Sequence, residues 1–209
     1  FEEALLHVAG QPARFEASCP PGGMIAVLAP PALWHEMPVL ARDSEIAGIS
    51  AAGHFVLSAP AGALAPVEAE LRARSVAFQR LPVGFAFHSR WIDPAAEACR
   101  AADAGLRLAA PFWPCWSSCL GRPLDPAAPP PDFAWRIVRE PMDLRGCFTA
   151  LEEQGVEGRG GVRYVDLSPS GTLAALARQN MAASSASQTL ALLSPFGGNM
   201  KRLEEVTRN

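Results

Sequence analysis

Between residues 23 and 88, short apolar runs alternate with segments whose apolar residues recur every three or four positions. The runs are bounded by Gly, Pro or polar residues and predict β-strands at residues 24–29, 45–51, 54–58 and 76–88. The other segments predict helices at residues 31–40 and 61–75, the first of which Pro38 ends or kinks. The resulting order, βαββαβ, is typical of a ferredoxin-like unit.

The segments on either side of this unit also mix helices and strands. Further helices are predicted at residues 1–10, 95–103, 142–154 and 172–181. An edge strand with a turn at Gly121 is predicted within residues 111–124, and another strand at residues 161–167. Residues 126–131 are a proline-rich, linker-like loop, and the residues after 182 are expected to form a polar tail. The pattern as a whole predicts an α/β protein.

The composition is that of an ordinary globular protein, with 209 residues, 49% of them hydrophobic, and a formal net charge of -3. A nucleic-acid surface needs clustered Lys and Arg to replace counterions, so we expect no nucleic-acid partner. No stretch approaches the ~20 apolar residues that cross a bilayer, and no basic-then-apolar signal segment opens the chain. We therefore expect a cytoplasmic protein with no membrane partner, whose five cysteines are reduced thiols.

The last predicted strand ends in a histidine that lies beside small residues. Bulky apolar residues alternate there with smaller ones, so one face is expected to be buried and the other to leave space next to His88. The pKa of histidine lies near neutral pH, which makes it the usual base for a serine or cysteine nucleophile. By spacing alone, a histidine that only hydrogen-bonds within the core is the more common case.

The other candidate residues lack the pattern that their chemistry requires. Ser170 follows a predicted strand but lacks the G-x-S-x-G context of a nucleophile elbow, so it is interpreted as a helix cap. Cys115 and Cys119 have no second Cys or His pair downstream and are interpreted as buried thiols beside two tryptophans. The remaining histidines are isolated, and no glycine-rich phosphate loop occurs. We expect no metal site.

Five short motifs occur in the order and spacing of one enzyme family. They are Leu81–Ser89 (LPVGFAFHS) with Asp93-Pro94, His54–Pro60 (HFVLSAP), Gly121–Leu124 (GRPL), Arg139–Met142 (REPM) and Asp166–Pro169 (DLSP). Each motif is weak alone, but together they run colinearly from residue 1 to about residue 182. In this respect the chain resembles the acyltransferase domains of polyketide synthases and the malonyl-CoA:ACP transacylases.

This resemblance implies an α/β fold with an α/β-hydrolase-like large subdomain, incomplete here, and an inserted ferredoxin-like small subdomain. The implied boundaries are residues 1–22 for the end of the first part of the large subdomain, 23–86 for the small subdomain, 87–182 for the remainder of the large one, and 183–209 for a C-terminal tail. In the family the active site lies in the cleft between the two subdomains.

The resemblance also implies a Ser-His dyad, in which His88 is the base. The family's serine, in G-H-S-x-G, is expected upstream of Phe1 and is not in this chain. Ile137 stands where the family usually has Asn or Gln to support the histidine, so we expect a backbone carbonyl to support the ring. The implied partner is acyl carrier protein, which carries the acyl thioester on phosphopantetheine, and no cofactor is implied.

The position of one family arginine suggests which acyl group is used. Transacylases that load malonyl carry an arginine that pairs with the substrate carboxylate, and the matching residue here is Gln11 or, with one inserted residue, Pro12. Gln11 and Phe87 are expected to contact the substrate. Glutamine in place of that arginine resembles the pederin-type acyl hydrolases of trans-acyltransferase polyketide pathways.

Three hypotheses about function follow. The first is a thioester hydrolase that releases acyl groups from acyl carrier protein. The second is a malonyl transacylase in which Arg14 takes the role of the missing arginine. The third is an inactive docking domain of a synthase. The arginines at 72, 74 and 80 could meet an acidic carrier protein, although a solvated helix face is the simpler interpretation.

Overall fold

The predicted βαββαβ segment forms most of one mixed sheet. The computed structural model describes residues 2–106, 112–125, 130–158 and 160–207, and the chain divides into two units, Phe1–Leu144 and Arg145–Asn209. In the first unit the sheet order is β4-β1-β3-β2-β7, with β1 (Gly22–Val27), β2 (Glu45–Ala51), β3 (His54–Pro60), β4 (Phe78–Arg80) and β7 (Met142–Asp143). The first four strands are antiparallel neighbours, as in a ferredoxin-like unit, and β7 runs parallel to β2. The α/β fold class is confirmed.

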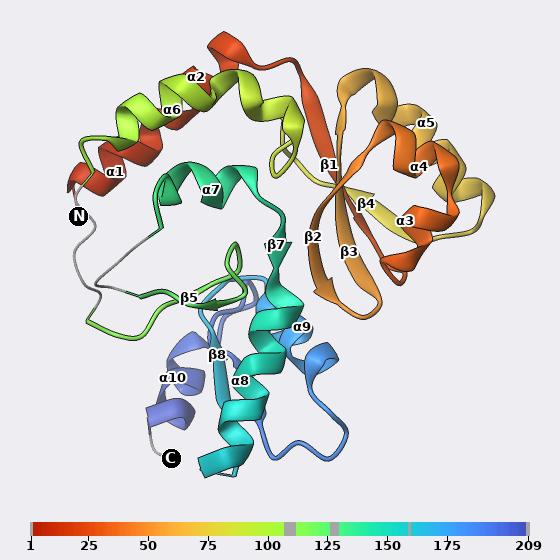
Figure 1. The fold of residues 1–209 in the computed structure, drawn as a ribbon. Helices are drawn as coiled ribbons and strands as arrows, with labels where there is room; N and C mark the ends of the chain where they lie inside the picture. Colours follow the sequence, from red (N-terminus) through yellow and green to blue (C-terminus); the bar gives the residue numbers. More distant parts are fainter. Residues whose placement is uncertain (1, 107–111, 126–129, 159, 208–209) are drawn as a thin grey trace. The chain divides into compact units, whose positions relative to one another are not determined.

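Three helices cover one face of this sheet (Figure 1): α3 (Ala32–Glu36), α4 (Pro38–Asp43) and α5 (Ala61–Ala73). Pro38 separates α3 from α4, as predicted, because proline cannot donate the backbone hydrogen bond that a continuous helix needs. Alternate strand residues, such as Phe55 and Leu57, pack against these helices in the main core. Full burial of each such side chain contributes about 1.5–3 kcal/mol.

The opposite face of the sheet holds the segment that contains His88. This face carries the buried residues Met24 and Val56, and Phe87 packs against them. Ser58 is fully buried and comes from the same face of β3, and its hydroxyl donates a hydrogen bond to the carbonyl of Phe87. Because successive side chains of β3 point to opposite faces, one face of the strand contributes to the apolar core and the other anchors the His88 segment through Ser58.

The prediction of a strand over residues 76–88 is wrong beyond Arg80. Leu81 still donates to the carbonyl of Met24 (2.9 Å), but Val83 donates back to Leu81 (2.8 Å) and closes a turn around Pro82. Proline has no N–H for the ladder, so the strand ends there even though the apolar alternation continues. Burial departs from the alternation as well, since Val83 is 37% exposed.

Helices pack around a second core in the same unit. They are α2 (Gln11–Ser18), the 3-10 helix η1 (Arg90–Ala95), α6 (Ala96–Asp103) and α7 (Phe133–Arg139), and α1 (Glu2–Ala9) precedes them without a buried residue. Figure 1 shows α6 running alongside α1 and α2. The core residues come from α2, the residue after it, η1, α6 and α7: Phe15, Cys19, Ile92, Ala95, Cys99 and Trp135.

The N-terminal helix ends at Gly10 as predicted, but α2 follows it at once. Gly10 itself keeps right-handed helical angles (φ -82°, ψ -11°), and a proline follows in the first turn of α2, where its missing N–H costs nothing. The glycine and proline therefore interrupt the helix without ending the helical segment.

The Trp- and Pro-rich segment forms a short hairpin of β5 (Trp116–Ser117) and β6 (Arg122–Pro123). Gly121 occupies the left-handed region (φ +62°), which confirms the predicted turn. The expectation of buried thiols is wrong, since Cys115 is exposed and Cys119 is only partly buried. Trp113, which was expected to cover them, is itself 72% exposed. Most of the predicted proline-rich loop, residues 126–129, lies outside the described residues.

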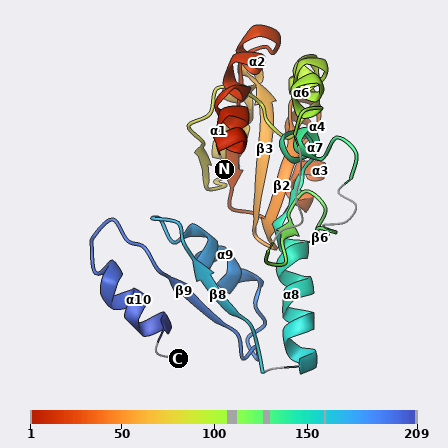
Figure 2. The ribbon, with the colours of Figure 1, turned by 90° about the vertical axis from the view of Figure 1, so that its left-hand side faces the viewer.

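The second unit has a parallel pair of strands and three helices (Figure 2): α8 (Leu144–Gly158, which starts at the boundary), β8 (Arg163–Asp166), α9 (Thr172–Asn180), β9 (Gln188–Ala191) and α10 (Asn199–Thr207). The helix predicted from residue 142 begins two residues later, because residues 142–143 pair with β2 instead. Strand β9 and helix α10 lie in the part of the chain that was expected to be a tail.

Asp166, rather than Ser170, caps α9. Its carboxylate is buried and accepts hydrogen bonds from the backbone N–H of Ser168 (2.7 Å) and of Ala174 (2.9 Å). Burial raises the pKa of Asp166, but these N–H donors outweigh it and hold the pKa below its ordinary value. The Ser170 hydroxyl pairs with that of Thr172 (2.8 Å), so the prediction of a serine cap is wrong.

Candidate active site

His88 lies at a sharp bend, not on the open face of a strand. Its backbone is left-handed (φ +59°), which is uncommon for a residue with a side chain. Three hydrogen bonds hold the bend: His88 N–H donates to Val138 (2.9 Å), and the hydroxyls of Ser58 and Ser89 donate to the carbonyls of Phe87 and Ala86. The surrounding contacts thus fix a conformation that the chain would not adopt on its own.

The histidine ring is oriented by a carbonyl. Nδ1 of His88 lies 2.8 Å from the carbonyl oxygen of Glu140. A carbonyl oxygen only accepts, so Nδ1 carries the proton and Nε2 keeps its lone pair. The expectation that a backbone carbonyl supports the ring is confirmed. Ile137, which stands where the resemblance implied an Asn or Gln, is 44% exposed.

Burial makes this imidazole easier to keep neutral. Removal of the ring from water lowers the pKa of His88, and the bond to the Glu140 carbonyl, which favours the charged form, compensates only in part. The ring is therefore neutral at pH 7, with Nε2 able to accept a proton. A general base needs this protonation state and tautomer.

Helix α2 packs against the residue next to His88. The rings of Phe15 and Phe87 meet edge to face with centroids 5.1 Å apart. Gln11 precedes Phe15 by four residues and is half-buried, so the two lie on the same face of α2. The face of α2 that carries Gln11 is thus the one that meets the His88 segment.

Arg14 lies towards a different neighbour. Nη2 of its guanidinium is 3.3 Å from where a side chain on Gly10 would begin. Burial raises the pKa of the Cys99 thiol in α6, and the charge of Arg14 acts against that rise, so the guanidinium lies close to α6. Nη1 is buried and has no hydrogen-bond partner among the described residues.

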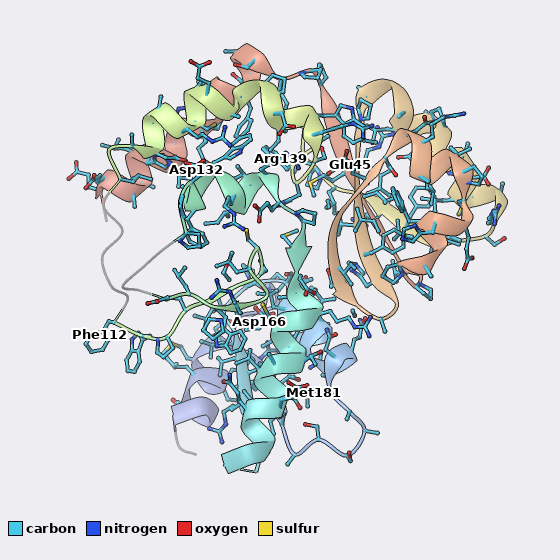
Figure 3. All side chains as sticks on the ribbon, viewed as in Figure 1. Glu45, Phe112, Asp132, Arg139, Asp166 and Met181 are labelled. Atoms are coloured by element: carbon cyan, nitrogen blue, oxygen red, sulfur yellow. The ribbon has the colours of Figure 1, made fainter. Side chains whose placement is uncertain are left out.

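Charged side chains gather at the C-terminal end of α7. Arg136 binds the Glu140 carboxylate through Nε (2.6 Å) and Nη2 (3.0 Å), and Arg139 pairs with Asp93. Figure 3 shows Arg139 and Asp132 at the two ends of the helix. These groups line a pocket of about 460 Å³. Glu140 was named only as part of the REPM motif. Its spacing of four from Arg136 indicates an ion pair only on a helix, and helix α7 was not predicted from the sequence.

The arginines considered for carrier-protein docking all have carboxylate partners. Arg72 and Arg80 both pair with Glu68 (3.1 and 2.6 Å), and Arg74 pairs with Glu70 (3.2 Å). These pairs favour the interpretation of a solvated helix face over that of an anion-binding patch.

The described part of the chain offers no group of three or more His, Cys, Asp or Glu side chains that could hold a metal ion. Within the same residues, none of the helices has the length and apolar character needed to span a bilayer.

Comparison with known proteins finds relatives in polyketide biosynthesis. The chain is 34% identical over 206 residues to the polyketide biosynthesis acyltransferase homolog BaeD of Bacillus velezensis, and 33% identical over 205 residues to the homolog PksD of Bacillus subtilis. Each match covers 98% of this chain and 61% of the relative, so the chain spans about three fifths of their length. No family model matches the chain.

Solved structures share its fold. The acyltransferase domain from the second module of the salinomycin polyketide synthase matches 98% of this chain and 47% of that chain, with a TM-score of 0.79 and 23% identity. The malonyl-CoA:acyl carrier protein transacylase from Xanthomonas oryzae matches 93% of this chain and 59% of that chain, with a TM-score of 0.69 and 25% identity.

Proposed function

We propose that this chain, whose relatives are acyltransferase homologs of polyketide biosynthesis as its motifs indicated, provides the base of an enzyme that hydrolyses acyl thioesters on acyl carrier protein. The observation that carries the proposal is the fixed imidazole of His88, whose Nδ1 donates to a carbonyl and whose Nε2 is left as an acceptor. The substrate is an acyl group on the phosphopantetheine arm of the carrier, and no cofactor takes part.

The proposed reaction has two steps that use the same nitrogen. Nε2 of His88 takes the proton of a serine hydroxyl, supplied by a segment that precedes this chain, as the oxygen attacks the thioester carbonyl. The carrier thiolate leaves and takes that proton. In the second step Nε2 takes a proton from a water molecule as the water oxygen attacks the acyl-serine carbonyl. The serine oxygen leaves and takes that proton from Nε2, which releases the free acid and restores the neutral base.

The environment of α2 supports an uncharged acyl group. Gln11 provides a neutral amide where malonyl transacylases place a cation, so a malonyl carboxylate would enter without a charged partner. Arg14 lies close to α6 and beside Gly10, which does not favour the alternative in which it replaces that cation.

The test uses the full-length protein with its serine-bearing segment and follows the products over time by mass spectrometry. One set of reactions contains acetyl- or malonyl-carrier protein, and a second contains malonyl-CoA with unloaded carrier protein. Release of acetate with little use of malonyl is the expected result. Transfer of malonyl to carrier protein would instead establish a transacylase, and no turnover of either substrate would leave the docking-domain hypothesis.

A further inference from the structure

The carbonyl that orients His88 belongs to a residue whose own side chain is held firmly. Glu140 ends α7 and has extended backbone angles (φ -81°, ψ 148°), so its carbonyl turns away from the helix axis towards the histidine. Pro141 follows and disfavours the helical conformation at residue 140. The direction of this carbonyl therefore depends on what fixes residue 140.

Two side chains, Arg136 and Cys119, hold the Glu140 carboxylate. Arg136, one helical turn earlier, binds it with two N–H groups in the bidentate geometry that suits a carboxylate. The bonds from Arg136 hold the pKa of Glu140 below its ordinary value, so the carboxylate is ionised at neutral pH. Arg139 pairs with Asp93 instead.

The contact from Cys119 comes from the turn of the β5–β6 hairpin. The thiol of Cys119 lies 3.4 Å from Oε2 of Glu140 and 3.4 Å from the carbonyl of Arg136. Burial, together with Glu140, raises the pKa of Cys119 to about 11, so the thiol stays protonated and acts as the donor. The hairpin is itself tied to β7, because the N–H of Asp143 donates to the carbonyl of Ser118 (2.6 Å).

We propose that Glu140 is a positioning residue for His88. Its side chain, held by Arg136 and Cys119, fixes the direction of its own carbonyl, and that carbonyl orients the imidazole of His88. This inference rests on the proposed function, in which His88 is the base, and adds the groups that set its orientation. None of the three side chains is assigned contact with the substrate. Their effect is on the tautomer and direction of the ring.

The test compares Glu140→Ala and Arg136→Ala with the control Glu70→Ala in the full-length protein. Glu70 in α5 forms an ion pair of the same spacing with Arg74, the residue that follows this helix. We expect kcat to fall up to about 100-fold in the first two variants, with KM unchanged, because the base is misplaced. The control should retain the wild-type kcat. Equal kcat in all four proteins would overturn the inference.

A second readout does not depend on the reaction. ¹⁵N spectra of the His88 ring should show a protonated Nδ1 in the wild type and the control, and a mixture of tautomers in Glu140→Ala. An unchanged Nδ1–H signal in Glu140→Ala would refute the positioning role, whatever the substrate proves to be. A wild-type enzyme that hydrolyses no acyl thioester but loses this signal in the variant would refute only the proposed function.

Rescue separates positioning from loss of folding. The double variant Arg136→Glu, Glu140→Arg restores an i,i+4 pair in its more favourable order but leaves the Cys119 thiol without its acceptor on residue 140, so it should recover part of the lost kcat. Cys119→Ser keeps a hydroxyl donor and should stay within a few-fold of the wild type. Failure of the folded double variant to recover either the tautomer or kcat would contradict the proposal.

Discussion

Substitution of His88 tests its chemistry and its backbone separately. His88 has a φ of +59°, where a side chain other than Gly, Asn or Asp costs about 1–2 kcal/mol. All three variants His88→Asn, His88→Gly and His88→Ala lose the base, so hydrolysis of acyl-carrier protein should fall about 10²–10⁴-fold in each. All three also lose the imidazole bond to Glu140, at a cost of about 0.5–1.5 kcal/mol.

Their stabilities should nevertheless differ. Asn and Gly tolerate the left-handed conformation, whereas Ala does not, so His88→Ala should be less stable than His88→Asn by about 1 kcal/mol. Urea unfolding followed by circular dichroism measures the difference, and mass spectrometry measures hydrolysis. An Ala variant as stable as the Asn variant would show that the bend is not strained, and hydrolysis by His88→Asn at the wild-type rate would show that His88 is not the base.

Three further predictions follow from the same structure. Because burial holds the pKa of His88 below 6.5, kcat/KM should be constant near pH 7 and decline only as the pH falls below that value; a pH–rate profile with its midpoint above 6.5 would contradict this. Gln11→Arg should increase the use of malonyl-carrier protein relative to acetyl-carrier protein, measured as the ratio of their kcat/KM values; an unchanged ratio would remove Gln11 from the acyl site. Asp166→Ala should destabilise the protein by about 1–2 kcal/mol in denaturant unfolding through loss of the cap on α9. Folding lowers the pKa of Asp166, so the extra stability of the wild type over Asp166→Ala should be complete above the unfolded pKa of 3.8 and should disappear as the pH falls through the pKa of the folded state. A stability difference that persists at low pH would contradict the capping role.

Elements with a clear local signal could be predicted from the sequence. The strands around Ile25, Leu57 and Val165 and the break at Pro38 all depend on nearby residues, so periodicity and proline chemistry were enough. The segment after Arg80 misled the prediction because its alternation is that of a strand. Only the tertiary hydrogen bonds show that Pro82 turns the chain and that the alternate residues do not share a face.

The site was predictable in part. His88 emerged from its motif, and its carbonyl support was expected, but the left-handed bend comes from Ser58 and Val138, which are far from it in sequence. The ion pair of Glu140 with Arg136 depends on helix α7, which was not predicted, and the thiol contact from Cys119 depends on a hairpin whose place only the fold determines. Long-range contacts of this kind leave no period in the sequence.

The short strand β7 attaches the carbonyl that orients His88 to the same sheet as His88 itself. Phe87 is tied to β3 through Ser58, while the Glu140 carbonyl lies two residues before Met142, which pairs with Gly48 of β2. Strands β2 and β3 are neighbours in one sheet, so the donor Nδ1 of His88 and the acceptor carbonyl of Glu140 are both anchored to that sheet. A displacement of this sheet would alter the distance from Nε2 to an incoming nucleophile but would leave the protonation pattern of the ring intact. The reaction rate would then change with that distance alone, while the acidity of the base stayed constant.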